Sequence, residues 1–124
     1  MGSYAVVWAS PFPTLIRVTA GEFVVVLTTL GNPAQARQFV QRLVEERVIA
    51  CGTILPGATS VYRWRGTVTA EDEVVVLMKT PRARWDALKA AVEANHPYEV
   101  PELLALPVVA GLDRYLDWVS SETS

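Results

Sequence analysis

The stretch Phe23-Val24-Val25-Val26-Leu27, with Asn32-Pro33 shortly after it, decides how this chain folds. Its five consecutive apolar residues predict a central strand that is buried on both faces. Asn32 is a favourable N-cap and Pro33 suits the first helical position, so a helix is expected directly after that strand. This helix would lay one apolar face on the sheet through residues at helical spacing: Ala36, Phe39, Val40, Leu43 and Val44.

More strands are predicted by further β-branched and apolar runs, at residues 48–55, 59–65, 73–79 and 103–109. Pro56-Gly57 predicts a turn between the first two of these strands, and Gly66 closes the second. The acidic residues where the third strand begins, Glu71, Asp72 and Glu73, are interpreted as a solvated turn.

Two more helices complete the pattern. Thr80 before Pro81 predicts a helix start, and His96-Pro97 stops this second helix after Asn95. Leu112, Tyr115, Leu116 and Val119 predict a short amphipathic helix at the C-terminus. The order of elements is typical of an α+β, ferredoxin-like split βαβ sandwich, in which an antiparallel sheet carries its helices on one face.

Length and composition describe one folded domain. The chain has 124 residues, of which 51% are hydrophobic and 19% charged, with a formal net charge of −2. This charge argues against broad nucleic-acid contact, and no apolar stretch approaches the roughly 20 residues of a membrane span. The single cysteine, Cys51, cannot form an internal disulfide, which favours a reducing, cytoplasmic location.

The N-terminal residues follow a different pattern from the rest. Residues 1–21 are interpreted as an appendage to a main domain that covers residues 22–124. Two β-rich runs in the appendage, at residues 4–8 and 15–19, are expected to add edge strands to the main sheet.

Two residue types in this chain could bind a metal ion or act as a nucleophile. His96, the only histidine, lies in the stiff segment His96-Pro97-Tyr98-Glu99-Val100-Pro101-Glu102, and a neutral imidazole is a common metal ligand. The alternative is that this segment is only a rigid helix-to-strand connection. Cys51 would need His96 beside it for thiol catalysis or for soft-metal binding, and otherwise it is a buried, inert cysteine.

Aromatic residues alternate along the predicted strand at residues 59–65. Tyr62 and Trp64 therefore project from one face, and Arg63 projects from the other. Tyr and Trp combine a large apolar area with a polar group, so this face is predicted to pack against another subunit. Stacking on nucleic acid is the weaker alternative, because the protein is acidic.

The motifs together carry a resemblance to one known family. From Glu22 to the C-terminus the chain resembles the CutA divalent-cation-tolerance family. The matching residues are Cys51, Ile54-Leu55-Pro56-Gly57, Ser60-x-Tyr62-x-Trp64-x-Gly66, Glu73, Lys79-Thr80, His96-Pro97-Tyr98, Pro101-Glu102 and Tyr115-Leu116-x-Trp118. Their order along about a hundred residues makes the resemblance specific.

The resemblance implies a ferredoxin-like subunit in a PII-like homotrimer, whose neighbouring sheets join edge to edge and bury Tyr62 and Trp64. It also implies a role in tolerance of copper and other divalent cations, with neither a catalytic reaction nor an organic cofactor. Some bacterial members of the family are described as binding copper at three positions that read Thr28, Asn95 and His96 here. Thr28 and Asn95 are poor ligands for soft metals, so metal binding by His96 and Cys51 is expected to be weaker or at a modified site.

Three functional hypotheses follow. The first is a trimeric metal-binding protein that uses His96 and Cys51. The second is a PII-like sensor that binds a small anionic or polar ligand in clefts between its subunits, with Lys79, Arg63, Tyr98 and Glu102 as lining residues. The third is a thiol enzyme that uses Cys51 and His96; it ranks last because the sequence shows no activated nucleophile.

Overall fold

The computed structural model describes residues 16–19 and 21–124. Within these ranges ten elements follow one another: β1 (Ile16–Val18), β2 (Phe23–Leu30), α1 (Pro33–Glu45), β3 (Cys51–Trp64), β4 (Thr67–Pro81), the 3₁₀ turn η1 (Arg82–Arg84), α2 (Trp85–Asn95), β5 (Leu104–Pro107), β6 (Ala110–Leu112) and α3 (Asp113–Glu122). None of the helices in the described ranges is long and apolar enough to cross a membrane.

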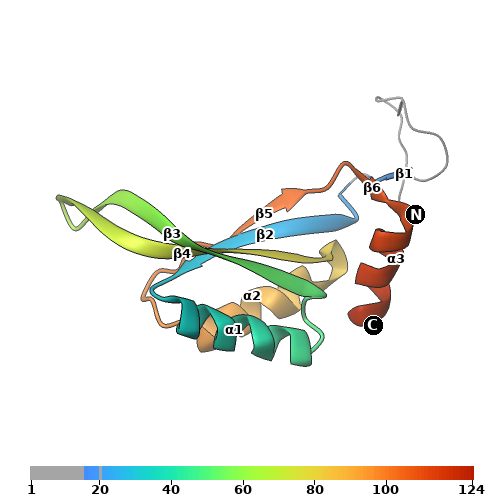
Figure 1. Cartoon of the computed structure of the whole chain (residues 1–124), viewed down its shortest axis with the longest axis horizontal. Coiled ribbons are helices and arrows are strands. Elements are labelled where there is room, and N and C mark those ends of the chain that lie inside the picture. Colours follow the sequence, from blue (N-terminus) through green and yellow to red (C-terminus); the bar gives the residue numbers. More distant parts are fainter. Residues whose placement is uncertain (1–15, 20) are drawn as a thin grey trace.

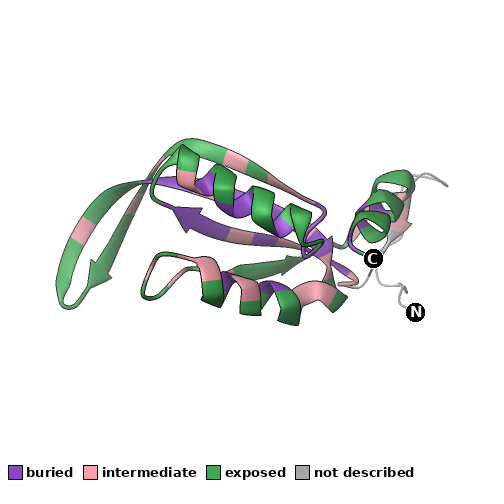
Figure 2. Ribbon diagram, turned by 90° about the horizontal axis from the view of Figure 1, so that it is seen from below, coloured by how far each residue is buried: buried purple, intermediate pink, exposed green. Residues whose placement is uncertain are grey.

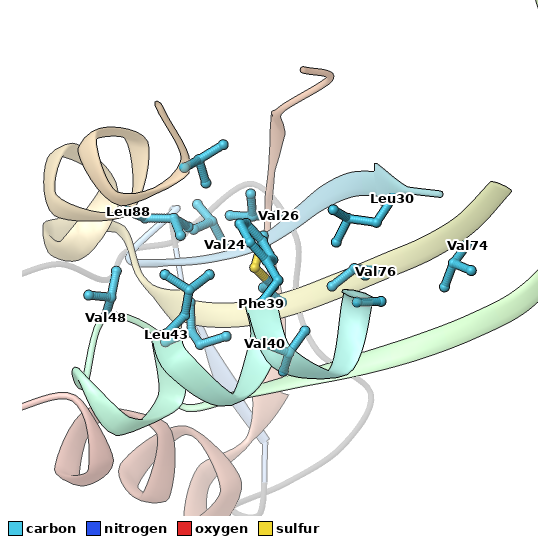
Figure 3. Close-up of a cluster of buried hydrophobic side chains, with 14 residues drawn as sticks. Val24, Val26, Leu30, Phe39, Val40, Leu43, Val48, Val74, Val76 and Leu88 are labelled. Atoms are coloured by element: carbon cyan, nitrogen blue, oxygen red, sulfur yellow. The ribbon is translucent and has the colours of Figure 1, made fainter. Parts of the chain in front are cut away.

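The centre of the molecule is a four-stranded antiparallel sheet in the order β3-β4-β2-β5. Helices α1 and α2 cover one of its faces, so the predicted α+β, ferredoxin-like class is confirmed (Figure 1). The main core lies between that face and the two helices, with Val26, Leu43 and Met78 fully buried (Figure 3). We call the opposite side of the sheet the open face.

The first helix begins as the sequence predicts. The side chain of Asn32 accepts a hydrogen bond from the backbone N–H of Gln35 at 2.8 Å, and Pro33 is the first helical residue. The buried side of α1 consists of Ala36, Phe39, Val40 and Leu43.

The second helix begins differently from the prediction. Thr80 does not cap α2; it is a buried residue of β4, and its hydroxyl donates to the carbonyl of Val48 at 2.8 Å. Pro81 ends β4, and the turn η1 separates it from α2, which has no side-chain cap. The predicted stop is confirmed, because α2 ends at Asn95 with His96 at its C-cap.

The two longest strands correct two further predictions. Pro56-Gly57 is not a turn: β3 is continuous, with an irregularity in its register between Leu55 and Ala58 where Gly57 takes φ +89°. Glu71, Asp72 and Glu73 are not a solvated turn either, because all three lie within β4. Together β3 and β4 form a long hairpin that reaches beyond the helices, and its distal part is largely exposed (Figure 2).

The N-terminal strand lies outside the main sheet. β1 pairs antiparallel with β6 to form a separate two-stranded sheet beside α3. Arg17 joins this sheet to α3 through ion pairs with Asp113 at 3.3 Å and Asp117 at 3.1 Å. The predicted run at residues 4–8 lies outside the described residues.

Candidate functional site

A groove of about 640 Å³ lies where the β3–β4 hairpin meets the segment at residues 98–102. Aromatic and acidic side chains dominate its lining, from three parts of the chain. They are Tyr62 and Trp64 on β3, Glu71 and Glu73 on β4, and Tyr98, Glu99 and Glu102 in the segment before β5. The strand register places Tyr62, Trp64, Glu71 and Glu73 on the open face of the sheet.

Two tyrosine–glutamate pairs cross the groove lining. The hydroxyl of Tyr98 donates to Glu73 Oε2 at 2.6 Å, and that of Tyr62 donates to Glu71. The hydrogen bond to Glu71 is the largest cause that raises the pKa of Tyr62. Burial, and then Glu73, raise the pKa of Tyr98 far above its usual value. Both phenols therefore stay protonated and orient the carboxylates.

The two pairs differ in burial, which allows a matched test. Glu73 is buried, at 9% relative exposure, whereas Tyr62 is an exposed residue. Tyr98→Phe should lower the free energy of unfolding by about 1–3 kcal/mol, because it leaves a buried carboxylate without its donor. Tyr62→Phe is the control, and its effect should be clearly smaller because its partner Glu71 is exposed and can bind water in place of the lost hydroxyl. Urea denaturation of both variants measures this; equal losses would show that burial does not decide the strength of these pairs.

His96 is held by hydrogen bonds at both ring nitrogens. Its Nε2–H donates to the carbonyl of Thr29 at 2.8 Å, and its Nδ1 accepts from the backbone N–H of Tyr98 at 3.1 Å. The ring also packs edge-on against Phe39 and Tyr98. Burial lowers the pKa of His96, against weaker opposing effects of Thr29 and Glu73. The imidazole is thus neutral, and a metal ion could reach a nitrogen only by replacing one of these bonds.

Cys51 lies at the other end of the sheet. Its Sγ is 3.5 Å from the hydroxyl of Tyr115 on α3, and its strand partner is Lys79. Burial and the contact with Cys51 raise the pKa of Tyr115 to about 12. The ammonium of Lys79 is occupied nearby, where it donates to Thr53 Oγ1 at 2.7 Å.

The structure does not bring Cys51 and His96 together. Thr29, whose carbonyl binds His96, pairs with Val75 on β4, and Cys51 pairs with Lys79, four residues further along the same strand. At the usual rise per strand residue this separates the two sites by about 13 Å. This separation removes the geometric basis for a Cys51–His96 catalytic pair.

The residues at the family's other metal positions are also engaged. Thr28 donates its hydroxyl to the carbonyl of Glu102 at 2.7 Å, and Asn95 donates its side-chain amide to the carbonyl of Ala91 at 2.8 Å. Residues 16–19 and 21–124 contain no group of three or more His, Cys, Asp or Glu side chains that could hold a metal ion. The described residues of a single chain therefore do not supply the set of ligands that a closed metal site needs.

The four predicted cleft residues fall in different places. Tyr98 and Glu102 line the groove. Lys79 lies beside Cys51, and Arg63 projects from the other face of β3, where its Nη1 donates to the carbonyl of Gly66 at 3.5 Å. Glu71 and Glu73 were not predicted as groove residues, although their spacing of two residues in a strand would have placed them on one face.

Comparison with known proteins agrees with this architecture. The class is defined by the four-stranded antiparallel sheet with two helices on one face, which the chain shares with solved proteins of the PII-like fold. A structure titled CutA from Synechococcus elongatus covers 88% of this chain and 96% of its own, at 35% identity and a TM-score of 0.84. The profile described as CutA1 divalent ion tolerance protein matches residues 24–122. The chain belongs to this family of divalent-cation-tolerance proteins.

Two curated relatives support the assignment. A protein of Thermus thermophilus named divalent-cation tolerance protein CutA is 46% identical over 99 residues, which are 80% of this chain and 96% of the relative. A protein of Arabidopsis thaliana named protein CutA, chloroplastic, is 38% identical over 100 residues, or 81% of this chain and 55% of the relative. The first of these names describes tolerance of divalent cations, and neither names an enzyme activity.

Proposed function

We propose that this protein acts in divalent-cation tolerance as a cytoplasmic homotrimer without catalytic turnover. The observation that supports the homotrimer is the exposure of large apolar side chains along the two free edges of the sheet. On β3, Val61 is 69% and Trp64 42% exposed; on β5, Leu104 is 56% and Leu106 51% exposed. Long apolar edges of this kind are aggregation hazards in a monomer and are removed by pairing between subunits.

The two free edges differ from each other, which favours a ring. Contact between β3 of one subunit and β5 of the next is head-to-tail, and such contacts close into a ring when the rotation allows it. In this arrangement Tyr62 and Trp64 lie at the subunit interface. The family's resemblance to PII-like trimers supports a ring of three.

For metal ions, His96 and Cys51 are proposed as two separate donors and not as ligands of one shared site. His96 and Cys51 each offer one nitrogen or sulfur atom, and a single donor of this kind binds copper or another divalent cation weakly. No organic cofactor is part of the proposal.

A native mass spectrum with and without a small excess of copper or zinc tests the proposal. The expected species is a trimer that gains integral metal ions, with fewer in His96→Gln and in Cys51→Ser. His96→Gln is chosen because the glutamine amide can still donate to Thr29. A trimer that binds neither metal, or one that gains as many ions in both variants as in the wild type, would overturn the assigned donors. A monomer would overturn the assembly.

A second candidate function is favoured by the groove itself. A concave site with aromatic walls and fixed polar groups is typical of small-molecule binding. We propose as the alternative a PII-like sensor that binds a small ligand in this groove, at the cleft between subunits. The acidic lining of the groove would repel an anionic ligand, which was one of the two ligand types expected from the sequence.

A further inference from the structure

The charge of the groove limits what can bind there. Among the described residues, the ion pairs give Glu99 one cationic partner, Arg65, whose Nη2 is 3.1 Å from Glu99 Oε1. The same ion pairs give no cation to Glu71, Glu73 or Glu102. Within one chain, three carboxylates around this cavity thus have no cationic partner, and their field disfavours a phosphate or carboxylate ligand.

The size of the groove argues against a bare metal ion as its main ligand. A divalent metal needs several donor atoms within about 2–2.6 Å of one point. The carboxylates are instead spread over β4 and the segment before β5, around about 640 Å³, and the described residues form no group that could hold a metal. A larger cation, with its charges set apart, matches this distribution better.

The aromatic residues add a second requirement. Tyr62, Trp64 and Tyr98 provide aromatic surface beside the carboxylates, which suits cationic groups and methylene chains. The chain already shows such a contact at the rim: the guanidinium of Arg65 lies 5.3 Å from the ring centroid of Trp64 while it pairs with Glu99. One cationic group of the protein thus uses an aromatic ring and a carboxylate of this groove together.

We infer that the groove binds an organic polyamine, with ammonium groups on the glutamates and methylene segments against the aromatic rings. This inference rests on the second candidate function, a small-ligand site in the groove, and it names the chemical class of that ligand. Arg65 occupies part of the same surface and therefore competes with the polyamine for Glu99 and Trp64.

Calorimetric titration of the full chain with spermidine tests the inference. Glu71→Gln with Glu102→Gln should raise the Kd for spermidine about tenfold, because two charges of the lining are lost. Glu93→Gln, on the exposed side of α2, is the matched control and should leave the Kd unchanged. Arg65→Ala should lower the Kd several-fold, because it frees Glu99 and Trp64.

The outcomes separate this inference from the proposals on which it depends. Native mass spectrometry of every variant reports the assembly independently of spermidine. Absence of binding at millimolar spermidine, an equal loss in Glu93→Gln, or weaker binding in Arg65→Ala would each overturn the inference. Binding of glutamate or phosphate in place of spermidine would retain a small-ligand site in the groove but overturn the polyamine assignment.

Discussion

Replacing Tyr62 and Trp64 together with glutamate is expected to convert the proposed trimer into monomers. Tyr62 and Trp64 are 38% and 42% exposed in the single chain and would become buried at the interface. Each subunit of the variant would bring two new charges into a surface that excludes water, and an unpaired buried charge costs several kcal/mol. Loss of the trimer at micromolar concentration should therefore be complete. Light scattering behind size-exclusion chromatography measures the mass directly.

Val44→Glu provides a matched control for this substitution. Val44 is also 38% exposed, but it lies on α1, in the helical layer on the face of the sheet opposite to Tyr62 and Trp64. The control should keep the mass of the wild type. A trimer that survives the double substitution, or that is lost equally in the control, would show that the hairpin aromatics do not form the interface.

The second large effect is expected from His96→Ala. This change leaves the carbonyl of Thr29 and the N–H of Tyr98 without partners and removes the ring contact with Phe39. Each partly buried group left unpaired costs about 1–3 kcal/mol, so the free energy of unfolding should fall by about 2–4 kcal/mol at pH 7.5. His96→Gln should lose less, because its amide can donate to Thr29. Urea denaturation of the three proteins gives the comparison.

The same residue predicts how stability depends on pH. Burial lowers the pKa of His96 below the ordinary value of 6.5, so the unfolded chain takes up a proton at a pH where the folded chain does not. The stabilising contribution is therefore full above about pH 6.5 and is lost as the pH falls toward the lowered pKa. Between pH 7.5 and 5.5 the wild type should lose more stability than His96→Gln. Equal losses would show that another group controls the acid response.

Much of the fold could be predicted because local signals and burial agree there. The strand at Phe23 and the cap at Asn32 both follow from short-range chemistry that the fold leaves unchanged. The wrong predictions concern short sequences that are typical of two different local structures. Pro56-Gly57 is typical of a turn, but a glycine at positive φ also serves a strand irregularity; Thr80-Pro81 is typical of a helix start, but the end of β4 uses it instead.

The site was harder to predict than the fold, since it depends on contacts between distant parts of the chain. Tyr98 was singled out, but its partner Glu73 is 25 residues away and was assigned to a turn. Cys51 and His96 could be paired only on chemical grounds, and the strand register separates them. A correct interpretation of β4 as one strand would have placed Glu71 and Glu73 beside Tyr62 on the open face.

The irregularity in β3 switches which of the alternating residues of the strand point to the open face of the sheet. Before the irregularity, Cys51 pairs with Lys79 and Leu55 with Val75, so the odd-numbered residues of β3 lie on the open face. After the irregularity, Ala58 pairs with Glu73 and Tyr62 with Thr69, so the even-numbered residues lie on that face. One additional residue in β3 therefore decides that both aromatic rings join the glutamates. Without that residue the same sequence would present Val61 and Arg63 there, and a one-residue deletion would invert the distal hairpin while leaving the core half of the strand in place.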